Sequence, residues 1–151
     1  MYSQSFRSPC GNLTVSASER GVTAVTFTGN RVHNNQPGRI TALACEQLQA
    51  YFAGDITTFD LPLDLQGTDF QKRVWQQLLR VNYGETASYG DIAVQLDNPK
   101  AVRAVGMANS KNPVAIVVPC HRIIGSNGSL TGYAGGLERK RYLLNLEGVK
   151  I

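Results

Sequence analysis

The chain has 151 residues, of which 42% are hydrophobic and 17% charged, a composition typical of a folded protein and not of a disordered or fibrous chain. At roughly 100–200 residues per domain, this length predicts one domain or two small ones. The longest aliphatic run, Val114 to Val118, is far shorter than the ~20 apolar residues of a membrane-spanning helix. Residues 1–12 are polar, which predicts no secretory signal. We therefore expect a cytoplasmic protein without a membrane partner.

The charge is distributed unevenly along the chain. Residues 1–65 carry four arginines against five carboxylates, and residues 66–151 carry the other eleven basic and six acidic residues. The net charge of +4 is therefore divided into −1 for the first part and +5 for the second. A basic second part predicts a polyanionic partner for that part, with ordinary solvated surface charge as the alternative.

The three cysteines, Cys10, Cys45 and Cys120, are an odd and widely spaced set. This pattern argues against a disulfide framework and predicts a reducing compartment. A zinc site built from Cys10, Cys45 and His33 would have irregular ligand spacing, so we expect neither a metal nor another cofactor.

Residues 1–66 have the pattern of a small α/β domain with an antiparallel sheet and a helix. Apolar residues alternate with small or polar ones over Leu13–Ala17 and Val22–Phe27, which predicts a β-hairpin. Apolar residues then fall at helical spacing over Ile40–Phe52, and Gly54 ends that helix. An extended connector, Asp60–Leu65, leads to a domain boundary near residue 66.

Residues 67–151 open with three predicted helices. Thr68 and Gln71 form a capping-box pattern ahead of the first, and Ser88 caps the second. Asn98 is the predicted N-cap of the third, with Pro99 at its first position, where a missing N–H costs nothing. Only two residues would separate the second and third helices, which is a helix-turn-helix pattern. A plain helical hairpin is the alternative.

The third helix has a composition that suits close approach to DNA. Small side chains would let it lie against a backbone or in a narrow groove, which bulky side chains prevent. The small residues are Ala101, Ala104, Gly106 and Ala108, and the basic residues around them are Lys100, Arg103 and Lys111.

Cys120 is the strongest candidate for a reactive residue. The apolar run Val114–Val118 predicts a buried strand before it, and Pro119 fixes the backbone at the strand end. An imidazole can lower a cysteine pKa, and His121 is next in sequence. Since neighbouring side chains of an extended segment point apart, we expect them to interact through a bridging water or a turn, with Glu147 as the acceptor that orients His121. A buried structural cysteine is the alternative.

A glycine-rich loop and a basic helix follow. Residues 125–136 hold five glycines around Tyr133, so the backbone of this loop could approach a flat ligand closely. The last predicted helix, Leu137–Glu147, carries Arg139, Lys140 and Arg141. These side chains predict either a solvated face or contacts to phosphate.

In several ordered motifs the chain resembles the O6-alkylguanine-DNA alkyltransferases, also called methylated-DNA–protein-cysteine methyltransferases. The resemblance is strong over about residues 47–151 and looser before them. The matching stretches are Phe70-Gln71 through Trp75, Tyr89-Gly90, Arg103-Ala104-Val105-Gly106, Asn112-Pro113, Pro119-Cys120-His121-Arg122-Ile123-Ile124, Tyr133-Ala134-Gly135-Gly136-Leu137, Leu143-Leu144 and Glu147-Gly148.

The resemblance implies an α+β fold with two domains. A ribonuclease-H-like α/β domain, residues 1–66, would precede a mostly helical, winged-helix-like domain, residues 67–151, with the helix-turn-helix and the reactive cysteine. The implied function is repair of double-stranded DNA containing O6-alkylguanine after nucleotide flipping, and the sequence leaves open whether O4-alkylthymine is also a substrate. Each molecule would accept one alkyl group, without a cofactor, and would act as a monomer.

The resemblance also implies a role for the residues of the reaction. Cys120 would accept the alkyl group. His121 would be a water-linked base held by Glu147, and Asn112 would brace the turns around the site. Alkyltransferase-like proteins, which bind lesions without accepting the group, lack this cysteine, so its presence argues against that branch.

A second set of residues would contact DNA. Tyr89 would help to rotate the target nucleotide and hydrogen-bond its base, and Arg103 would insert into the stack. The other residues of this set would be Ala101, Ala104, Asn109, Ile123, Tyr133 and Ala134. Ala134 stands where many relatives have a serine, so only its backbone could serve.

Two other classes of protein remain as alternatives. A DNA-binding regulator would use the helix-turn-helix and keep Cys120 inert. A cysteine hydrolase would use Cys120 and His121, but it needs an oxyanion hole, and adjacent residues give poor geometry for it.

Overall fold

The structure is a computed structural model that describes residues 1–29 and 36–150. The chain divides into two compact units, Met1–Gln66 and Gly67–Ile151. The first holds an antiparallel sheet and one helix, and the second is mostly helical, so the α+β fold class is confirmed. No helix among the described residues is both long enough and apolar enough to cross a membrane.

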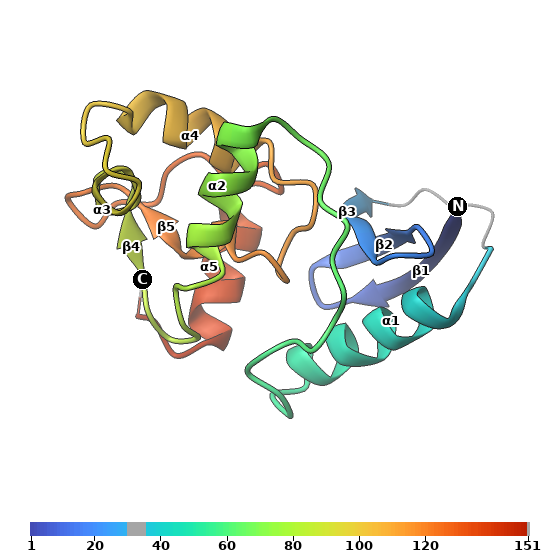
Figure 1. The fold of residues 1–151 in the computed structure, drawn as a ribbon. Helices are drawn as coiled ribbons and strands as arrows, with labels where there is room; N and C mark the ends of the chain where they lie inside the picture. The colour runs from blue at the N-terminus through green and yellow to red at the C-terminus, as the bar shows by residue number, and fades with distance from the viewer. Residues whose placement is uncertain (30–35, 151) are drawn as a thin grey trace. The chain divides into compact units, whose positions relative to one another are not determined.

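The first unit is a three-stranded antiparallel sheet with a helix packed against it (Figure 1). Strands β1 (Tyr2–Ser8), β2 (Gly11–Ala17) and β3 (Val22–Gly29) lie in that order. Helix α1 (Arg39–Phe52) contacts all three strands. The buried side chains that these elements contribute are Leu13, Val15, Ala17, Val22, Val25, Ala44, Leu48 and Tyr51.

Strand β1 is missing from the sequence prediction. Its residues, mostly serine, glutamine and arginine, are half-buried at the sheet edge, so they lack the alternation that marks a strand. These residues form a strand because they pair with β2, from Tyr2 opposite Ala17 to Ser8 opposite Gly11, and not because of their side-chain pattern.

The predicted end of α1 is confirmed. Gly54 adopts a φ of +80°, and its N–H donates to the carbonyl of Tyr51 at 3.0 Å while the N–H of Asp55 donates to Ala50 at 2.8 Å. These two bonds close the last turn and satisfy carbonyls that the helix leaves open.

The second unit packs four helices around a small parallel sheet (Figure 1). The helices are α2 (Asp69–Leu78), α3 (Tyr89–Gln95), α4 (Val102–Ser110) and α5 (Leu137–Leu146), and strands β4 (Ala87–Ser88) and β5 (Ile123–Ile124) pair in parallel. Thr68 makes the predicted capping box, and Ser88, the predicted cap of α3, makes one as well. Trp75 of α2 is buried and donates its indole N–H to the carbonyl of Ala108 at 2.8 Å, which joins α2 to α4.

The predicted start of the third helix is wrong. Asn98 is not its N-cap, because α4 begins at Val102 with Ala101 as N-cap. The N–H of Asn98 instead donates to Ala93 at 3.0 Å, and the N–H of Asp97, at φ +57°, donates to Val94 at 3.0 Å. Asn98 therefore closes α3 in a Schellman motif. Helices α3 and α4 still contact each other across this longer turn.

The predicted strand over Val114–Val118 is also wrong. These residues lie in turns, with Val114 making only an isolated bridge. Ile116 has a φ of +73°, and the N–H of Val118 donates to the carbonyl of Val114 at 3.0 Å. Most of the segment is buried as expected, but its backbone bonds are made within the turn rather than to a neighbouring strand.

Candidate active site

Cys120 lies at the first position of a short 3-10 helix, η1 (Cys120–Arg122). Its side chain is buried, with 5% exposed. The chain turns here because the N–H of Cys120 donates to Val118 at 2.8 Å and the N–H of Arg122 donates to Pro119 at 3.0 Å. The thiol and the imidazole of His121 are therefore carried on a turn, not on an extended strand.

Asn112 holds the segment before the cysteine in shape. Its amide Nδ2 donates to the carbonyls of Val118 at 2.8 Å and Val114 at 3.3 Å, and its Oδ1 accepts from the N–H of Val114 at 3.0 Å. One side chain thus takes the place of a neighbouring strand for these backbone groups. The same amide also hydrogen-bonds the thiol of Cys120.

The protonation of Cys120 follows from its surroundings. Burial raises the pKa of the thiol, and the hydrogen bond from Asn112 and the charge of Lys140 lower it against that larger effect. The resting group is a neutral thiol. A base must therefore take its proton before the sulfur becomes a strong nucleophile.

His121 is held in a buried charged triad. Its Nε2 lies 2.7 Å from Oε2 of Glu147, while Arg122 donates to the two oxygens of that carboxylate at 2.7 and 3.0 Å. Burial lowers the pKa of His121, and Glu147 partly opposes that effect. The imidazole is therefore neutral at rest, and the carboxylate stabilises it when it takes a proton.

The end of α5 positions Glu147. This residue is the C-cap of α5, and Gly148 follows with a φ of +88°. The N–H groups of Gly148 and Val149 donate to Asn145 at 3.0 Å and Leu144 at 2.9 Å. The helix end is thereby fixed, and with it the carboxylate that holds His121.

Lys140 corrects the prediction for the last helix. Its side chain is fully buried, so it is neither on a solvated face nor available to phosphate. The ammonium donates to the carbonyls of Ile123 and Thr131, and thus joins strand β5 to the glycine-rich loop. Burial lowers its pKa to about 8, and an ionised Cys120 nearby acts in the opposite direction.

Sequence reasoning missed the buried positions of Lys140 and Arg122. One signal for Lys140 is its spacing: it lies three and four residues before the buried Leu143 and Leu144, and seven before Glu147, so all four share one face of α5. Arg122 gives no comparable signal, since its partners, Glu147 and the carbonyl of Val81, are distant in sequence.

The charge of Lys140 leads to a pH prediction. We expect Lys140→Met to slow the alkylation of Cys120 by iodoacetamide about tenfold near neutral pH, because loss of a nearby cation would raise the thiol pKa by about one unit. Since the pKa of Lys140 is about 8, the unchanged protein loses this cation as the pH rises through that value. The rates of the two proteins should therefore converge at higher pH.

The matched control is Arg141→Met, because Arg141 is the exposed neighbour on the same helix. Its alkylation rate should follow that of the unchanged protein across the range. Two results would contradict the electrostatic role of Lys140. One is that Lys140→Met and the unchanged protein are alkylated at equal rates near neutral pH. The other is that their rates differ as much well above pH 8 as they do near neutral pH.

Tyr89 and the glycine-rich loop lie together on the second unit. The Tyr89 hydroxyl is 3.1 Å from Oγ1 and 3.4 Å from the carbonyl of Thr131. In this loop Tyr133 is half-buried and Ala134 is exposed. Ile123, on strand β5, is buried, and its carbonyl accepts from Lys140.

The predicted DNA-contacting residues of α4 divide between two faces. Arg103 and Ala104 are exposed, and Ala101 is half-buried at the N-cap. Asn109 is 2% exposed and its Nδ2 donates to the carbonyl of Cys120 at 3.5 Å, so its side chain is turned away from the exposed face. The assignment of Asn109 to a contact with DNA or its base stays a prediction.

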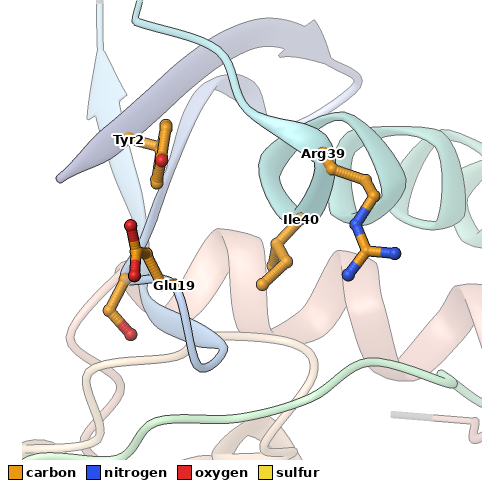
Figure 2. A pocket seen from close by; sticks show the side chains of 5 residues that line it. Tyr2, Glu19, Arg39 and Ile40 are labelled. Atoms are coloured by element: carbon orange, nitrogen blue, oxygen red, sulfur yellow. The ribbon is translucent and has the colours of Figure 1, made fainter.

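The first unit has a pocket but no comparable chemistry. Figure 2 shows the side chains of Tyr2, Glu19, Arg39 and Ile40 around it, and Ser18 completes the lining. This set includes no cysteine or histidine. Of the other cysteines, Cys10 is half-buried and Cys45 is buried, with a pKa raised to about 11 by that burial. Within residues 1–29 and 36–150, no three metal-binding side chains gather as a candidate site, and His33 lies outside these ranges.

The fold and the site define a class: a protein with a mostly helical unit that carries a braced, buried cysteine beside a carboxylate-held histidine. Residues 69–149 match the family described as 6-O-methylguanine DNA methyltransferase, DNA binding domain, and residues 1–65 match the ribonuclease-like domain of the same family. The chain belongs to the 6-O-methylguanine DNA methyltransferase family, whose members are DNA-repair methyltransferases. The resemblance found in the sequence is confirmed.

The similar proteins agree with this assignment. The methylated-DNA–protein-cysteine methyltransferase of Mycobacterium tuberculosis is 53% identical over 146 residues, covering 93% of this chain and 88% of the relative. That of Methanosarcina acetivorans is 48% identical over 154 residues, covering 98% and 99%. The crystal structure of Mycobacterium tuberculosis OGT in complex with DNA has a TM-score of 0.89 at 50% identity, covering 97% of this chain and 92% of that one.

Proposed function

We propose that this protein repairs O6-alkylguanine in double-stranded DNA by transferring the alkyl group to Cys120, once per molecule. The observation that carries the proposal is the buried cysteine on a turn braced by Asn112, with His121 and Glu147 behind it. The similarity to a relative solved with DNA supports the partner. A second similar structure is that of S. pombe Atl1 in complex with damaged DNA containing O6-carboxymethylguanine. Its TM-score is 0.51 at 31% identity, covering 57% of this chain and 82% of that one, and it supports the class of lesion.

The burial of Cys120 requires the lesion to leave the duplex. A side chain that is 5% exposed cannot reach O6 of a stacked guanine, so the nucleotide must rotate out of the helix, at a cost of a few kcal/mol. Phosphate contacts from the basic unit and insertion of the exposed Arg103 into the stack would offset that cost. The exposed face of α4 around Arg103 and Ala104 is the surface we assign to DNA.

The reaction then follows from the site. His121 takes the thiol proton, and Glu147 stabilises the imidazolium that forms. The thiolate attacks the alkyl carbon in line, so that a carbon–sulfur bond forms as the carbon–oxygen bond breaks. The electron pair stays with guanine, and the Tyr89 hydroxyl, which hydrogen-bonds Thr131 in the free protein, would stabilise the developing charge by donating to the base.

The product limits the protein to one reaction. A thioether on Cys120 is not reversed by thiol exchange, since exchange needs a disulfide. The remaining cysteines of the chain, Cys10 and Cys45, belong to the first unit. A protein used once gains nothing obvious from symmetry, and we propose that it acts as a monomer.

Excess substrate tests single use. The protein is mixed with an excess of duplex DNA carrying O6-methylguanine, and the methyl groups removed are counted over time. The count should stop at one per protein molecule. Continued removal beyond that point would show turnover and reject the proposal. A parallel duplex with O4-methylthymine should reach the same end point, because it presents the same alkyl-oxygen electrophile.

The role assigned to Arg103 predicts a difference between two substrates. We expect Arg103→Ala to slow methyl removal from duplex DNA by about 10–100-fold, in line with about 1–3 kcal/mol for a specific DNA contact. The reaction with free O6-methylguanine base should change by less than about twofold, as for ordinary surface substitutions. Single-turnover rates on the two substrates measure the difference.

Lys111→Ala is the matched control, because Lys111 is an exposed cation at the other end of α4. It should weaken duplex binding modestly and reduce its salt dependence. An equal loss on both substrates for Arg103→Ala would argue against insertion.

A further inference from the structure

Asn109 lies beside the turn that carries Cys120, and one of the two polar atoms of its side chain has no hydrogen-bond partner among the described residues. It is 2% exposed on the inner face of α4, and its Nδ2 donates to the carbonyl of Cys120 at 3.5 Å. Its Oδ1 is buried and has no hydrogen-bond partner among the described residues. Nδ1 of His121, the residue after Cys120, is likewise buried without a partner in that part of the chain.

Both atoms are acceptors. Because Nε2 of His121 faces the carboxylate of Glu147 at 2.7 Å, it carries the proton of the neutral ring, and Nδ1 keeps the lone pair. An amide oxygen is an acceptor by its nature. Two acceptors cannot bond each other, and a buried acceptor left without a donor is destabilising. A water molecule has two hydrogens and can satisfy both.

We propose that Asn109 is a positioning residue that holds a water molecule between its Oδ1 and Nδ1 of His121, with the water oxygen turned toward the thiol of Cys120. The inference rests on the proposed function, and it deepens it. As the alkyl group is attacked, the thiol proton passes to this water while the water gives one of its own protons to Nδ1. The water is regenerated, the sulfur becomes a thiolate, and the imidazolium is held by Glu147.

The charged groups around the relay come from two elements. Arg122 on η1 and Lys140 on α5 both disfavour a proton on His121, and Glu147 at the end of α5 favours it. Lys140 and the amide of Asn112 favour the thiolate of Cys120. A substitution at Asn109 removes its weak bond to the carbonyl of Cys120 but leaves all of these charged groups in place, so a shift of the pH midpoint reports on the loss of the water and not on a change of nearby charge.

The test is the pH profile of two variants that lack the acceptor oxygen. Asn109→Leu keeps a similar volume, and Asn109→Ala serves if the leucine variant does not fold. We expect the reaction with free O6-methylguanine base, and the alkylation by iodoacetamide, to slow about tenfold near neutral pH, with the midpoint of each profile shifted up by about one unit. Ser110→Ala is the control, because its exposed hydroxyl donates to the carbonyl of Met107 in its own helix.

A second comparison separates positioning from simple loss of packing. In a protein that already carries His121→Gln, Asn109→Ala should slow the reaction further by less than about twofold. The reason is that the effects of substitutions at residues that act as a unit do not add. A slower rate with an unmoved pH midpoint, or a full tenfold loss in both backgrounds, would overturn the inference. Failure of the unchanged protein to take a methyl group from DNA would instead reject the proposed function.

Discussion

Cys120→Ala is expected to remove methyl transfer completely while binding to duplex DNA stays within about twofold of the unchanged protein, as for a substitution outside the binding face. The sulfur is the atom that forms the new bond, and no other group of the site can replace it. The exposed face of α4, with Arg103 and Ala104, is left unchanged. Methyl loss from the DNA and a gel-shift titration measure the two quantities on the same duplex.

This variant also separates the three classes of protein that the sequence left open. A regulator with an inert cysteine would lose nothing in Cys120→Ala, because its activity would be DNA binding alone. A hydrolase would release the alkyl group as an alcohol, with turnover, in the unchanged protein. Methyl transfer that persists in Cys120→Ala would show that this sulfur is not the acceptor.

The second large effect is expected at Glu147. Glu147→Ala should lower the free energy of unfolding by about 3–5 kcal/mol, because it leaves a buried guanidinium without its carboxylate. Arg122 donates to both oxygens of Glu147 and His121 contacts one of them, with all three side chains buried. Since a small domain is stable by only about 5–15 kcal/mol, part of this variant should be unfolded at moderate temperature. Urea unfolding gives the value.

Two variants serve as controls for this effect. Glu147→Gln keeps the shape and one acceptor oxygen but not the charge. Its free energy of unfolding should therefore fall by less than that of Glu147→Ala, while its rate of methyl transfer should still fall strongly. Glu85→Ala removes an exposed carboxylate of the same unit and should change stability by less than about 0.5 kcal/mol. Equal stability of Glu147→Ala and Glu85→Ala would show that the triad does not stabilise the fold.

The features that sequence reasoning predicted well are local. The caps at Thr68 and Ser88 need only residues three apart, and Gly54 ends α1 through bonds to the preceding turn. The wrong predictions occur where another local interaction competes. Asn98 has the residue type of an N-cap, but its backbone completes the end of α3. The run Val114–Val118 has the composition of a strand, but the side chain of Asn112 bonds its backbone into turns.

In the candidate active site, too, some contacts could be predicted from the sequence and others depend on the fold. The contact between His121 and Glu147 was predicted as an orienting interaction, and the two side chains do meet at 2.7 Å. The buried roles of Lys140 and Arg122 were missed, because a basic residue is ordinarily exposed and only the fold supplies its carbonyl and carboxylate partners. The burial of Asn109 on α4 was likewise not predicted from the sequence.

The most direct measurement is the fate of the methyl carbon. Equal amounts of protein and duplex DNA carrying O6-methylguanine with an isotopically labelled methyl group are incubated, and the protein is digested and analysed by peptide mass. We expect the peptide containing Cys120 to gain one labelled methyl group in each reacted molecule, and the DNA to keep an unmodified guanine. Label on another residue, label released as methanol, or label that stays in the DNA would contradict transfer to Cys120.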